Sequence, residues 1–376
     1  MVLHFLAQFN KEIGATCKSL FFEKTFIISS FTKYKKHDIL ILMTYFITGV
    51  AGFIGYHLTK AIIKNGDTVV GMDSVNDYYS TDLKNKRLDD LKSLSGFVFY
   101  KKNIEDKTAL NEVFSKHDIT QVIHLAAQAG VRYSLENPYA YGSSNLTGFL
   151  TMLETARQFN IEHFLFASSS SVYGLNKKTP YSEKDAVDHP ISLYAATKKA
   201  NEVMAHSYSH LYGIPMTGLR FFTVYGPMGR PDMAYFKFAE LISANKPIDV
   251  YNNGELLRDF TYIDDVVEAI MLLSKKIPVQ RPCFDNESAG PDSSSAPFEI
   301  YNIGNESPEN LLFFIETLEK HLEKKAVKNF LPMQAGDVYI TSADTQKLFQ
   351  AVGWKPSTPL EKGLEKFCNW FKSYKN

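Results

Sequence analysis

A series of short apolar runs separated by amphipathic stretches is the feature that most restricts the fold of this chain. Stretches such as YHLTKAIIKNG and NLTGFLTMLETARQF have helical spacing and lie between the runs. Short runs that are apolar throughout are typical of strands buried on both faces, and helical connections between them favour parallel pairing. The sequence therefore predicts an α/β fold with a doubly wound parallel Rossmann sheet. The expected strands are residues 45–49, 68–73, 97–101, 121–126, 163–168 and 216–221.

The length of 376 residues leaves room for about two domains. After residue 221 the alternation breaks into mixed helix and loop, and the Pro/Ser/Gly-rich stretch 287–297 predicts a flexible surface loop. We expect residues 43–220 to form the Rossmann domain, with a return contribution from about residues 258–275. Residues 221–376 are expected to form mainly a smaller mixed α/β lobe that binds the substrate.

The first 42 residues have an uncertain status. They are rich in phenylalanine and carry lysines, but they lack a recognisable signal-peptide cleavage pattern. Because the first strand pattern begins just after Met43, we expect Met43 to be the functional start. The preceding segment would then be a non-conforming extension or the result of a misassigned start codon. A targeting or anchoring arm is the alternative.

Composition narrows the classes of partner. Lys plus Arg equals Asp plus Glu at 41 each, without long single-sign blocks, so no nucleic-acid partner is expected. No stretch reaches the roughly 18 uncharged apolar residues of a membrane helix, so no membrane span is expected. Cys17, Cys283 and Cys368 are far apart, odd in number and without metal spacing. They fit a cytoplasmic, reducing location without a metal site or a disulfide. A small molecule is the expected partner.

The first apolar run leads into TGVAGFIG, whose glycines are Gly49, Gly52 and Gly55. Gly49 allows a tight turn, Gly52 lets the backbone approach a pyrophosphate, and Gly55 permits close packing of helix on strand. The helix N-terminus, at Phe53 and Ile54, supplies unpaired N–H groups. A helix start with incidental glycines is the alternative interpretation of this motif alone.

The second run ends at Asp73, 18 residues after Gly55. A carboxylate in that position can accept both ribose hydroxyls of an adenosine. The next residues, Ser74 and Val75, include no arginine to neutralise a 2′-phosphate, so the sequence favours NAD over NADP. Further expected cofactor contacts at the same edge of the sheet are Asn103, Ile104, Leu125, Ala126, Ala127 and Ser144. For the alanines, close helix packing is an equal alternative.

The chemical groups follow the fifth run, which ends in FASSSSVYG. Ser169 lies in this serine run, and Tyr194 and Lys198 follow in SLYAATKKANE, four residues apart and thus on one helix face. A tyrosine with a pKa near 10 needs a depression of about three units to act as a base at neutral pH. A lysine one turn away and a positive nicotinamide can supply that depression. A surface pair of side chains is the alternative.

Several motifs occur in the order typical of one family. These are TGVAGFIG, HLAAQAGVRYSLENP, ASSSSVYG, SLYAATKKANE, RFFTVYGPMGRPDM, RDFTYIDDV, IYNIGN and MQAGDV. Over about residues 43–376 the chain resembles the extended short-chain dehydrogenases/reductases of the NAD-dependent epimerase/dehydratase family. It is most similar to the UDP-glucuronate 4-epimerases. The combination is far more specific than any single motif.

The resemblance implies an isomerase with tightly bound NAD. In such enzymes NAD takes a hydride from C4 of the sugar while the tyrosine takes the hydroxyl proton. The planar 4-keto sugar then turns over and receives the hydride on its other face. By matching motif positions, Tyr194 would be the acid and base, Lys198 would lower its pKa and hold the nicotinamide ribose, and Ser169 would bond the reacting oxygen. A homodimer is also implied.

The substrate would be a UDP-uronic acid, most simply UDP-glucuronate. The resemblance implies that Arg258 pairs with the diphosphate and that Asp337 reaches the uridine ribose. For the acid group of the sugar, Thr223 and Arg230 are the expected contacts, and Ser170 is a further one. Each has a structural alternative, namely a surface charge or a β-branched strand residue.

Two other functions remain open at this stage. On the same fold, a UDP-glucuronate decarboxylase begins with the same oxidation, and a 4,6-dehydratase needs an additional acid and base. Such enzymes usually place an Asp-Glu pair where this chain has Ser170 and Ser171, which argues against dehydration. A non-catalytic NAD-sensing protein is the alternative from a different class. It would usually lose Tyr194 or Lys198, and both are present.

Overall fold

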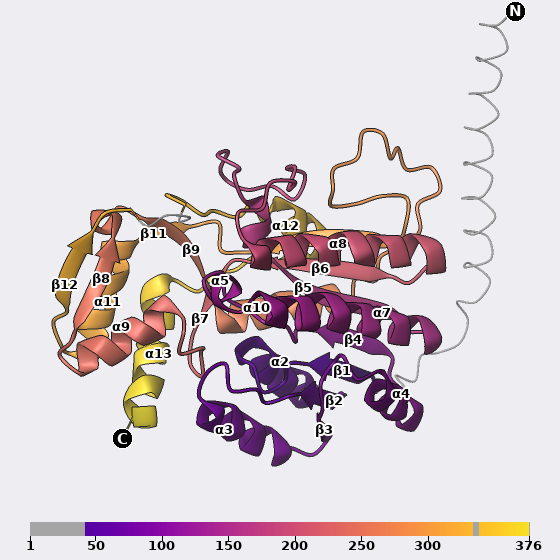
Figure 1. Cartoon of the computed structure of the whole chain (residues 1–376), viewed down its shortest axis with the longest axis horizontal. Coiled ribbons are helices and arrows are strands. Elements are labelled where there is room, and N and C mark those ends of the chain that lie inside the picture. The colour runs from indigo at the N-terminus through magenta and orange to yellow at the C-terminus, as the bar shows by residue number, and fades with distance from the viewer. Residues whose placement is uncertain (1–41, 334–337, 376) are drawn as a thin grey trace, which may run out of the picture. The chain divides into compact units, whose positions relative to one another are not determined.

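Seven parallel strands form the central sheet of the computed structural model, which describes residues 42–333 and 338–375 (Figure 1). The strand order is β10-β6-β5-β4-β1-β2-β3, so the direction of succession reverses between β1 and β4. Ligands of doubly wound sheets bind at such a reversal, beyond the carboxyl ends of the strands. The bounds are β1 Thr44–Thr48, β2 Thr68–Asp73, β3 Phe97–Lys101, β4 Gln121–His124, β5 His163–Ser169, β6 Met216–Phe221 and β10 Phe298–Ile303.

Each expected strand is present within two residues of its predicted ends, and the predicted fold class is confirmed. The strand β10 was not predicted. It comes from within residues 221–376 and pairs with β6 in parallel, from Phe298 opposite Met216 to Ile303 opposite Phe221. The sheet therefore draws on both parts of the chain that we expected to form separate domains, and that division stays a prediction.

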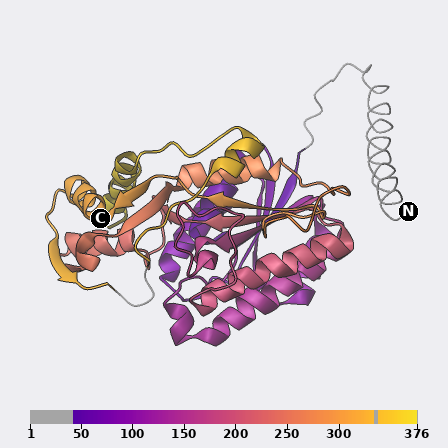
Figure 2. The same cartoon turned by 90° about the horizontal axis from the view of Figure 1, so that it is seen from above.

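Alternating side chains on each strand feed two cores, one on each face of the sheet. Phe46 and Phe164 belong to one core, and the next residues along each strand, Ile47 and Leu165, belong to the other. This period of two follows from the pleat of a strand. Helices cover both faces (Figure 2). They are α4 Lys107–Lys116, α7 Gly148–Gln158 and α8 Leu193–Tyr212 on the Phe46 side, and α2 Phe53–Lys64, α3 Thr81–Lys92 and α10 Ile263–Ser274 on the Ile47 side.

A smaller lobe is built from two short sheets and three helices, on the left of Figure 1. Its core is aromatic, with Phe260 stacked on Phe314 at 4.6 Å between ring centroids and Tyr235 edge-on to Phe367 at 5.0 Å. The elements are β7 Thr223–Tyr225, β8 Pro247–Tyr251, β9 Leu257–Tyr262, β11 Pro308–Asn310, β12 Val327–Leu331, α9 Ala234–Ser243, α11 Leu311–Leu322 and α13 Leu360–Lys375.

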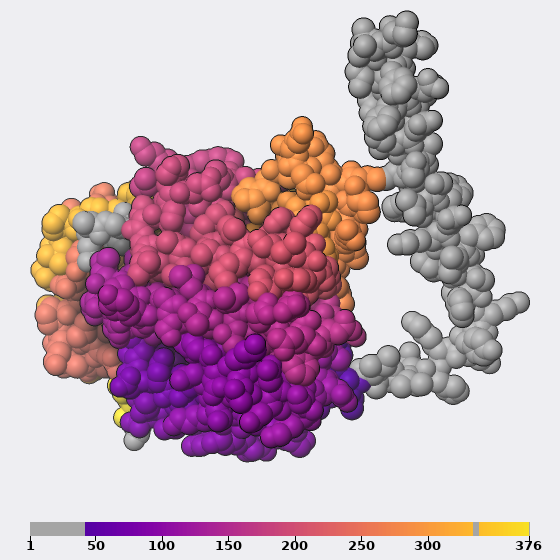
Figure 3. Space-filling view, turned by 45° about the vertical axis from the view of Figure 1, so that its right-hand side comes forward, coloured from indigo at the N-terminus to yellow at the C-terminus, as the bar shows by residue number. Residues whose placement is uncertain are grey.

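Short elements complete the chain. The segment 287–297 is irregular, but Asp292 and Ala296 within it are buried, so the predicted surface loop is confirmed only in part; the neighbouring surface is orange in Figure 3. The remaining elements are α5 Tyr133–Glu136, α6 Pro138–Tyr141, the π-helix η1 Gly142–Thr147, the 3₁₀ turns η2 Ser170–Tyr173 and η3 Asn252–Gly254, and α12 Gln346–Val352.

Some expectations concern residues outside the described ranges. The proposals for residues 1–42 fall almost wholly there. Within residues 42–333 and 338–375, no helix combines the length and apolar character that crossing a membrane requires. Cys368 is a buried free thiol. Cys283 is disulfide-bonded, so the expectation of no disulfide is wrong.

The added strand β10 is held by a buried carboxyl group. The backbone N–H of Asn302 donates to Oε1 of Glu183 at 2.8 Å, and the side chain of Glu183 is only 2% exposed. Burial raises the pKa of Glu183 to about 7, although the Asn302 N–H acts in the opposite direction. The folded protein therefore holds a proton on Glu183 that the unfolded chain releases at lower pH.

We predict that this proton makes stability fall as pH rises from about 4.5 to 7, because the folded state binds more protons than the unfolded state in that range. Glu183→Gln keeps an acceptor for the Asn302 N–H but does not titrate. The variant should reduce this loss in the free energy of unfolding by up to about 3 kcal/mol. Urea unfolding at a series of pH values measures it. An identical pH profile for both proteins would contradict the assignment.

Candidate active site

A cavity of about 710 Å³ opens where β1, β2, β4 and β5 end. Most of the residues singled out from the sequence line it, although they come from widely separated motifs. Arg258 does not, and Asp337 lies outside the described residues. The predicted residues that line the cavity are Gly49, Gly52, Phe53, Ile54, Gly55, Asp73, Asn103, Ile104, Leu125, Ala126, Ala127, Ser144, Ser169, Ser170, Tyr194, Lys198, Thr223 and Arg230.

The glycine-rich loop forms a tight cradle between β1 and α2. Gly49 has a φ of +80°, and a Cβ on Gly49 would lie 2.9 Å from the Ala126 nitrogen. A Cβ on Gly55 would lie 2.2 Å from the Gly49 carbonyl oxygen. No side chain caps the N-terminus of α2. The first-turn N–H groups are thus oriented to receive an anionic group, and the cradle fits the pyrophosphate of a dinucleotide.

Asp73 lies next to this cradle at the end of β2. Its carboxylate accepts the N–H of Ala51 at 3.0 Å and the N–H of Val75 at 2.8 Å, which fixes its orientation. Burial raises the pKa of Asp73, and these two N–H groups partly oppose that effect. Each oxygen retains a lone pair for a hydroxyl. The position therefore fits an adenosine ribose.

Lys84 is a cation of this site that the sequence search overlooked. Lys84 does not directly follow Asp73 in the sequence. It comes from α3 and lines the same cavity. Its Nζ donates to the carbonyl and side-chain oxygens of Asn76, at 2.5 and 2.6 Å. Burial lowers the pKa of Lys84, and the charge of Asp73 acts in the opposite direction.

The pair Tyr194 and Lys198 lies on the first turns of α8, which Ser192 caps through the N–H of Ala195 at 3.1 Å. Lys198 Nζ donates to the Ala167 carbonyl oxygen at 3.0 Å, at the end of β5. Burial lowers the pKa of Lys198 to about 8. The predicted helix face is therefore present and is bonded to the strand that carries Ser169.

The pKa of Tyr194 differs from the sequence-based expectation. Burial raises it, and a hydrogen bond with Ser169 and the charge of Arg230 lower it only in part. The ammonium group of Lys198 donates to the Ala167 carbonyl. The protein groups alone leave Tyr194 protonated at neutral pH. A tyrosinate would require a further positive charge beside it.

The serines that end β5 line the cavity, and the Ser168 hydroxyl also forms a structural hydrogen bond. Ser168 Oγ donates to Glu202 Oε1 at 2.6 Å, and Glu202 forms a buried ion pair with Arg220 at 2.9 Å. The Ser168 hydroxyl therefore bonds a side chain that belongs to a buried ion pair. Ser169 Oγ accepts the N–H of Ser171 at 3.2 Å. Ser171 lines the cavity as well.

Arg230 lies in the cavity wall, but a carboxylate already accompanies it. Its Nη2 is 2.5 Å from Asp232 Oδ2, and the same oxygen accepts the Tyr78 hydroxyl at 3.2 Å. An anionic substrate group would therefore meet Arg230 together with Asp232. Thr223 opens β7 in the same wall.

Arg258 is placed on β9. Its Nη1 donates to the carbonyl oxygens of Leu257 and Tyr339, at 3.0 and 3.1 Å. Its contact with a diphosphate stays a prediction, as does the contact of Asp337 with a ribose.

Contacts across loops bring in residues that were not among the predicted site residues. Tyr78 packs against Tyr133 with 4.7 Å between ring centroids, and both line the cavity. Asn145, in the π-helix η1, donates to the Gln128 carbonyl and to Thr197 Oγ1, each at 3.0 Å. It thereby ties the loop after β4 to α8. No local pattern marks these residues, because each acts through neighbours that are distant in sequence.

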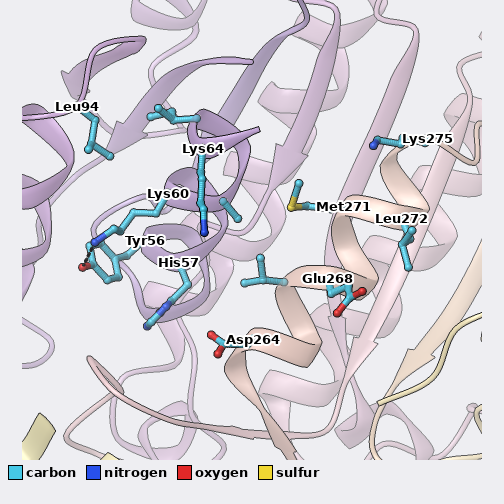
Figure 4. Close-up of a pocket in the computed structure, with 13 residues that line it drawn as sticks. Tyr56, His57, Lys60, Lys64, Leu94, Asp264, Glu268, Met271, Leu272 and Lys275 are labelled. Atoms are coloured by element: carbon cyan, nitrogen blue, oxygen red, sulfur yellow. Dashed lines mark hydrogen bonds between the residues drawn. The ribbon is translucent and has the colours of Figure 1, made fainter. Parts of the chain in front are cut away.

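A second cavity, of about 810 Å³, lies between α2 and α10 (Figure 4). None of the predicted site residues lines it. Its histidine, His57, has Nε2 2.9 Å from the Pro227 carbonyl oxygen, and burial lowers the pKa of His57 to about 4. This second cavity therefore lacks the glycine loop and the Ser169, Tyr194 and Lys198 side chains that line the first cavity.

A Rossmann sheet, a glycine cradle with a ribose-facing carboxylate, and a Ser-Tyr-Lys set define the class of extended short-chain dehydrogenases/reductases. A family model described as GDP-mannose 4,6 dehydratase matches residues 46–367. The chain belongs to this family, the NAD-dependent epimerases/dehydratases.

Individual relatives are similar over nearly the same range. Protein CapI of Staphylococcus aureus is 52% identical over 332 residues, which cover 88% of this chain and 99% of that protein. A probable UDP-glucuronate 4-epimerase of Rhizobium meliloti is 48% identical over 330 residues, covering 88% and 97%. The crystal structure of UDP-glucuronic acid 4-epimerase from Bacillus cereus, in complex with UDP-glucuronic acid and NAD, matches with a TM-score of 0.77 at 32% identity, covering 88% and 100%.

We predict that Gly55→Ala destabilises the protein by about 2 kcal/mol or more, because the new Cβ would lie 2.2 Å from the Gly49 carbonyl oxygen and the loop must shift. Gly142→Ala is the matched control, since a Cβ there meets nothing within 4 Å. The control should stay within about 1 kcal/mol of wild type. Urea unfolding followed by circular dichroism measures both. Equal stabilities of the two variants would refute the close approach.

Proposed function

We propose that this protein is an NAD-dependent isomerase that epimerises a UDP-uronic acid at C4, converting UDP-glucuronate to UDP-galacturonate through a transient 4-keto sugar. The observation that carries the proposal is the grouping of Ser169, Tyr194 and Lys198 beside the glycine cradle in one cavity. The names of its relatives in Rhizobium meliloti and Bacillus cereus support the substrate.

The cofactor proposed for the cradle is NAD. Gly49, Gly52 and the N-terminus of α2 would hold its pyrophosphate, and Asp73 would accept hydrogen bonds from the adenosine ribose. Bound NAD would supply the reversible two-electron oxidation of C4. Lys198, whose Nζ donates to the Ala167 carbonyl at 3.0 Å, would hold the other ribose.

Transfer of the C4 hydroxyl proton is the step that side chains of the protein would carry out. Tyr194 would accept the proton, and Ser169, whose side chain is one of the groups that lower the pKa of Tyr194, would bond the sugar oxygen. Because burial raises the pKa of Tyr194, the positive charges of Lys198 and of the bound nicotinamide are needed to favour its anion. After the keto sugar turns over, Tyr194 returns the proton to the same oxygen, and the enzyme is regenerated.

The carboxylate of the uronate would bind to side-chain hydroxyls and to an arginine that is paired with an aspartate. Ser170 and Thr223 line the cavity and can donate to a carboxylate, while Arg230 approaches together with Asp232. Dehydration would need an acid and a base at the positions of Ser170 and Ser171, whose hydroxyls do not titrate near neutrality. The site thus favours epimerisation over dehydration.

We further propose that the protein acts as a homodimer, in accord with the family resemblance. A mass of twice 42.6 kDa by light scattering is the expected result for the purified protein. A stable monomer would overturn this part of the proposal.

The test of the reaction is product analysis. Purified protein incubated with UDP-glucuronate should yield UDP-galacturonate without added reductant or metal. A UDP-pentose together with carbon dioxide would identify a decarboxylase instead. N-acetylated UDP-uronic acids, run in parallel, determine the preferred substrate. Absence of turnover of each of these compounds would overturn the proposal.

We predict that Tyr194→Phe lowers kcat by about a thousandfold, because the phenyl ring cannot accept the C4 proton. Affinity for UDP-glucuronate, measured by calorimetry, should stay within about threefold, since one hydroxyl contributes little to binding the whole nucleotide sugar. Tyr212→Phe is the control on the same helix, where the side chain is 47% exposed. A Tyr194→Phe enzyme within tenfold of wild type would contradict the mechanism.

A further inference from the structure

The guanidinium of Arg87, in α3, is the centre of a buried junction beside the active-site cavity. The side chain is 0% exposed. Its Nη1 donates to the Ala51 carbonyl and the Tyr79 hydroxyl, each at 2.7 Å. Its Nη2 donates to the Met228 and Gly229 carbonyls at 2.7 and 3.0 Å, and its Nε donates to Met228 at 3.2 Å. All five N–H groups of the arginine are therefore bonded to uncharged oxygens.

These acceptors belong to three separate loops. Ala51 lies inside the glycine cradle, and Tyr79 lies in the loop after β2 that follows Asp73. Met228 and Gly229 immediately precede Arg230, the cation proposed to meet the uronate. One side chain thus joins the cofactor side of the cavity to its substrate side.

The loop before Arg230 depends on these bonds for its shape. Met228 has a φ of +55°, a conformation that costs energy for a residue with a side chain, and its carbonyl accepts two of the Arg87 bonds. The preceding carbonyl, of Pro227, is bonded to His57 of α2 at 2.9 Å. A Cβ on Gly229 would lie 1.9 Å from the Tyr235 hydroxyl. Helices of the Rossmann part therefore hold the substrate loop.

The charge of Arg87 also reaches the cofactor site. It is one of the influences that lower the pKa of Asp73 against the dominant effect of burial. A buried cation surrounded by uncharged oxygens is costly unless a counter-charge lies nearby. The anionic pyrophosphate expected on the neighbouring N–H groups of the cradle would provide one.

We propose that Arg87 is a positioning residue that holds the glycine cradle and residues 227–230 in one arrangement, so that NAD retention and uronate binding depend on the same guanidinium. The proposal rests on the proposed function for the identity of the two ligands. Arg87 touches neither of them and acts through Ala51 and through the backbone before Arg230.

The experiment compares Arg87→Lys with wild type and with Lys86→Met. The lysine keeps the charge but has three donors without the planar fork, so it cannot hold all four oxygens. Lys86 is the neighbouring, exposed cation on the same helix, and it serves as the control for charge and for helix α3. Tyr79→Phe removes one acceptor and leaves Arg87 in place, so it provides a milder variant should Arg87→Lys not fold.

Two quantities are measured on the holoenzyme. Release of NAD is followed by absorbance after desalting at set times, and kcat and KM for UDP-glucuronate are measured with NAD in excess. For Arg87→Lys we expect NAD release and KM each to rise about tenfold or more, with kcat within about threefold, as the loss of two or more hydrogen bonds implies. Tyr79→Phe should shift both in the same direction by a smaller factor, and Lys86→Met should match wild type.

The outcomes separate this role from a merely structural one. A variant that is only less stable would lower apparent kcat through its unfolded fraction, with unchanged KM and NAD release, and that result would overturn the proposal. Wild-type NAD release in both Arg87→Lys and Tyr79→Phe would overturn it as well. NAD release needs no turnover. A wild-type protein that does not act on UDP-glucuronate would refute the proposed function. NAD release would still test whether Arg87 holds the glycine cradle.

Discussion

The attachment of α8 to the end of β5 is the constraint on which the site depends. Lys198 bonds the Ala167 carbonyl, and one turn later Glu202 bonds the Ser168 hydroxyl and the buried guanidinium of Arg220. These bonds fix how far the helix advances along the strand. Tyr194, one turn before Lys198, therefore lines the same cavity as Ser169. Removing one partner of a buried ion pair typically costs about 3–5 kcal/mol, so this register is strongly enforced.

In this arrangement the pKa of Tyr194 depends on both the protein and the bound cofactor. Enclosure at the strand ends raises the pKa of Tyr194, and the lysine that the sequence assigns to lower it is directed to a backbone carbonyl. A base of this kind becomes effective only when a second positive charge arrives beside it. Proton transfer would then be coupled to occupancy of the glycine cradle, and sugar bound in its absence would meet a neutral phenol.

The sequence was sufficient for features set by local spacing. The strands up to β6 follow from short runs that are apolar throughout. The glycines at 49, 52 and 55 and the Tyr194–Lys198 face follow from spacings of three and four residues, which the chain displays directly. Features set by contacts between distant segments were missed. The strand β10, Lys84 next to Asp73, and the Arg87 junction each require knowledge of which loops meet, and single residues without a motif do not carry that information.

The position of β10 in the sequence affects how the sheet forms during synthesis and folding. Strand β6 ends at Phe221, but its outer edge is covered only by residues 298–303, after β7, α9, β8 and β9 of the smaller lobe have been made. Until then the growing sheet presents a row of unpaired backbone groups, which is the kind of edge that recruits other strands. The nucleotide-binding half is thus completed by a strand from the far side of the lobe. A gene fragment ending near residue 220 would encode a sheet whose β6 edge lacks its partner strand.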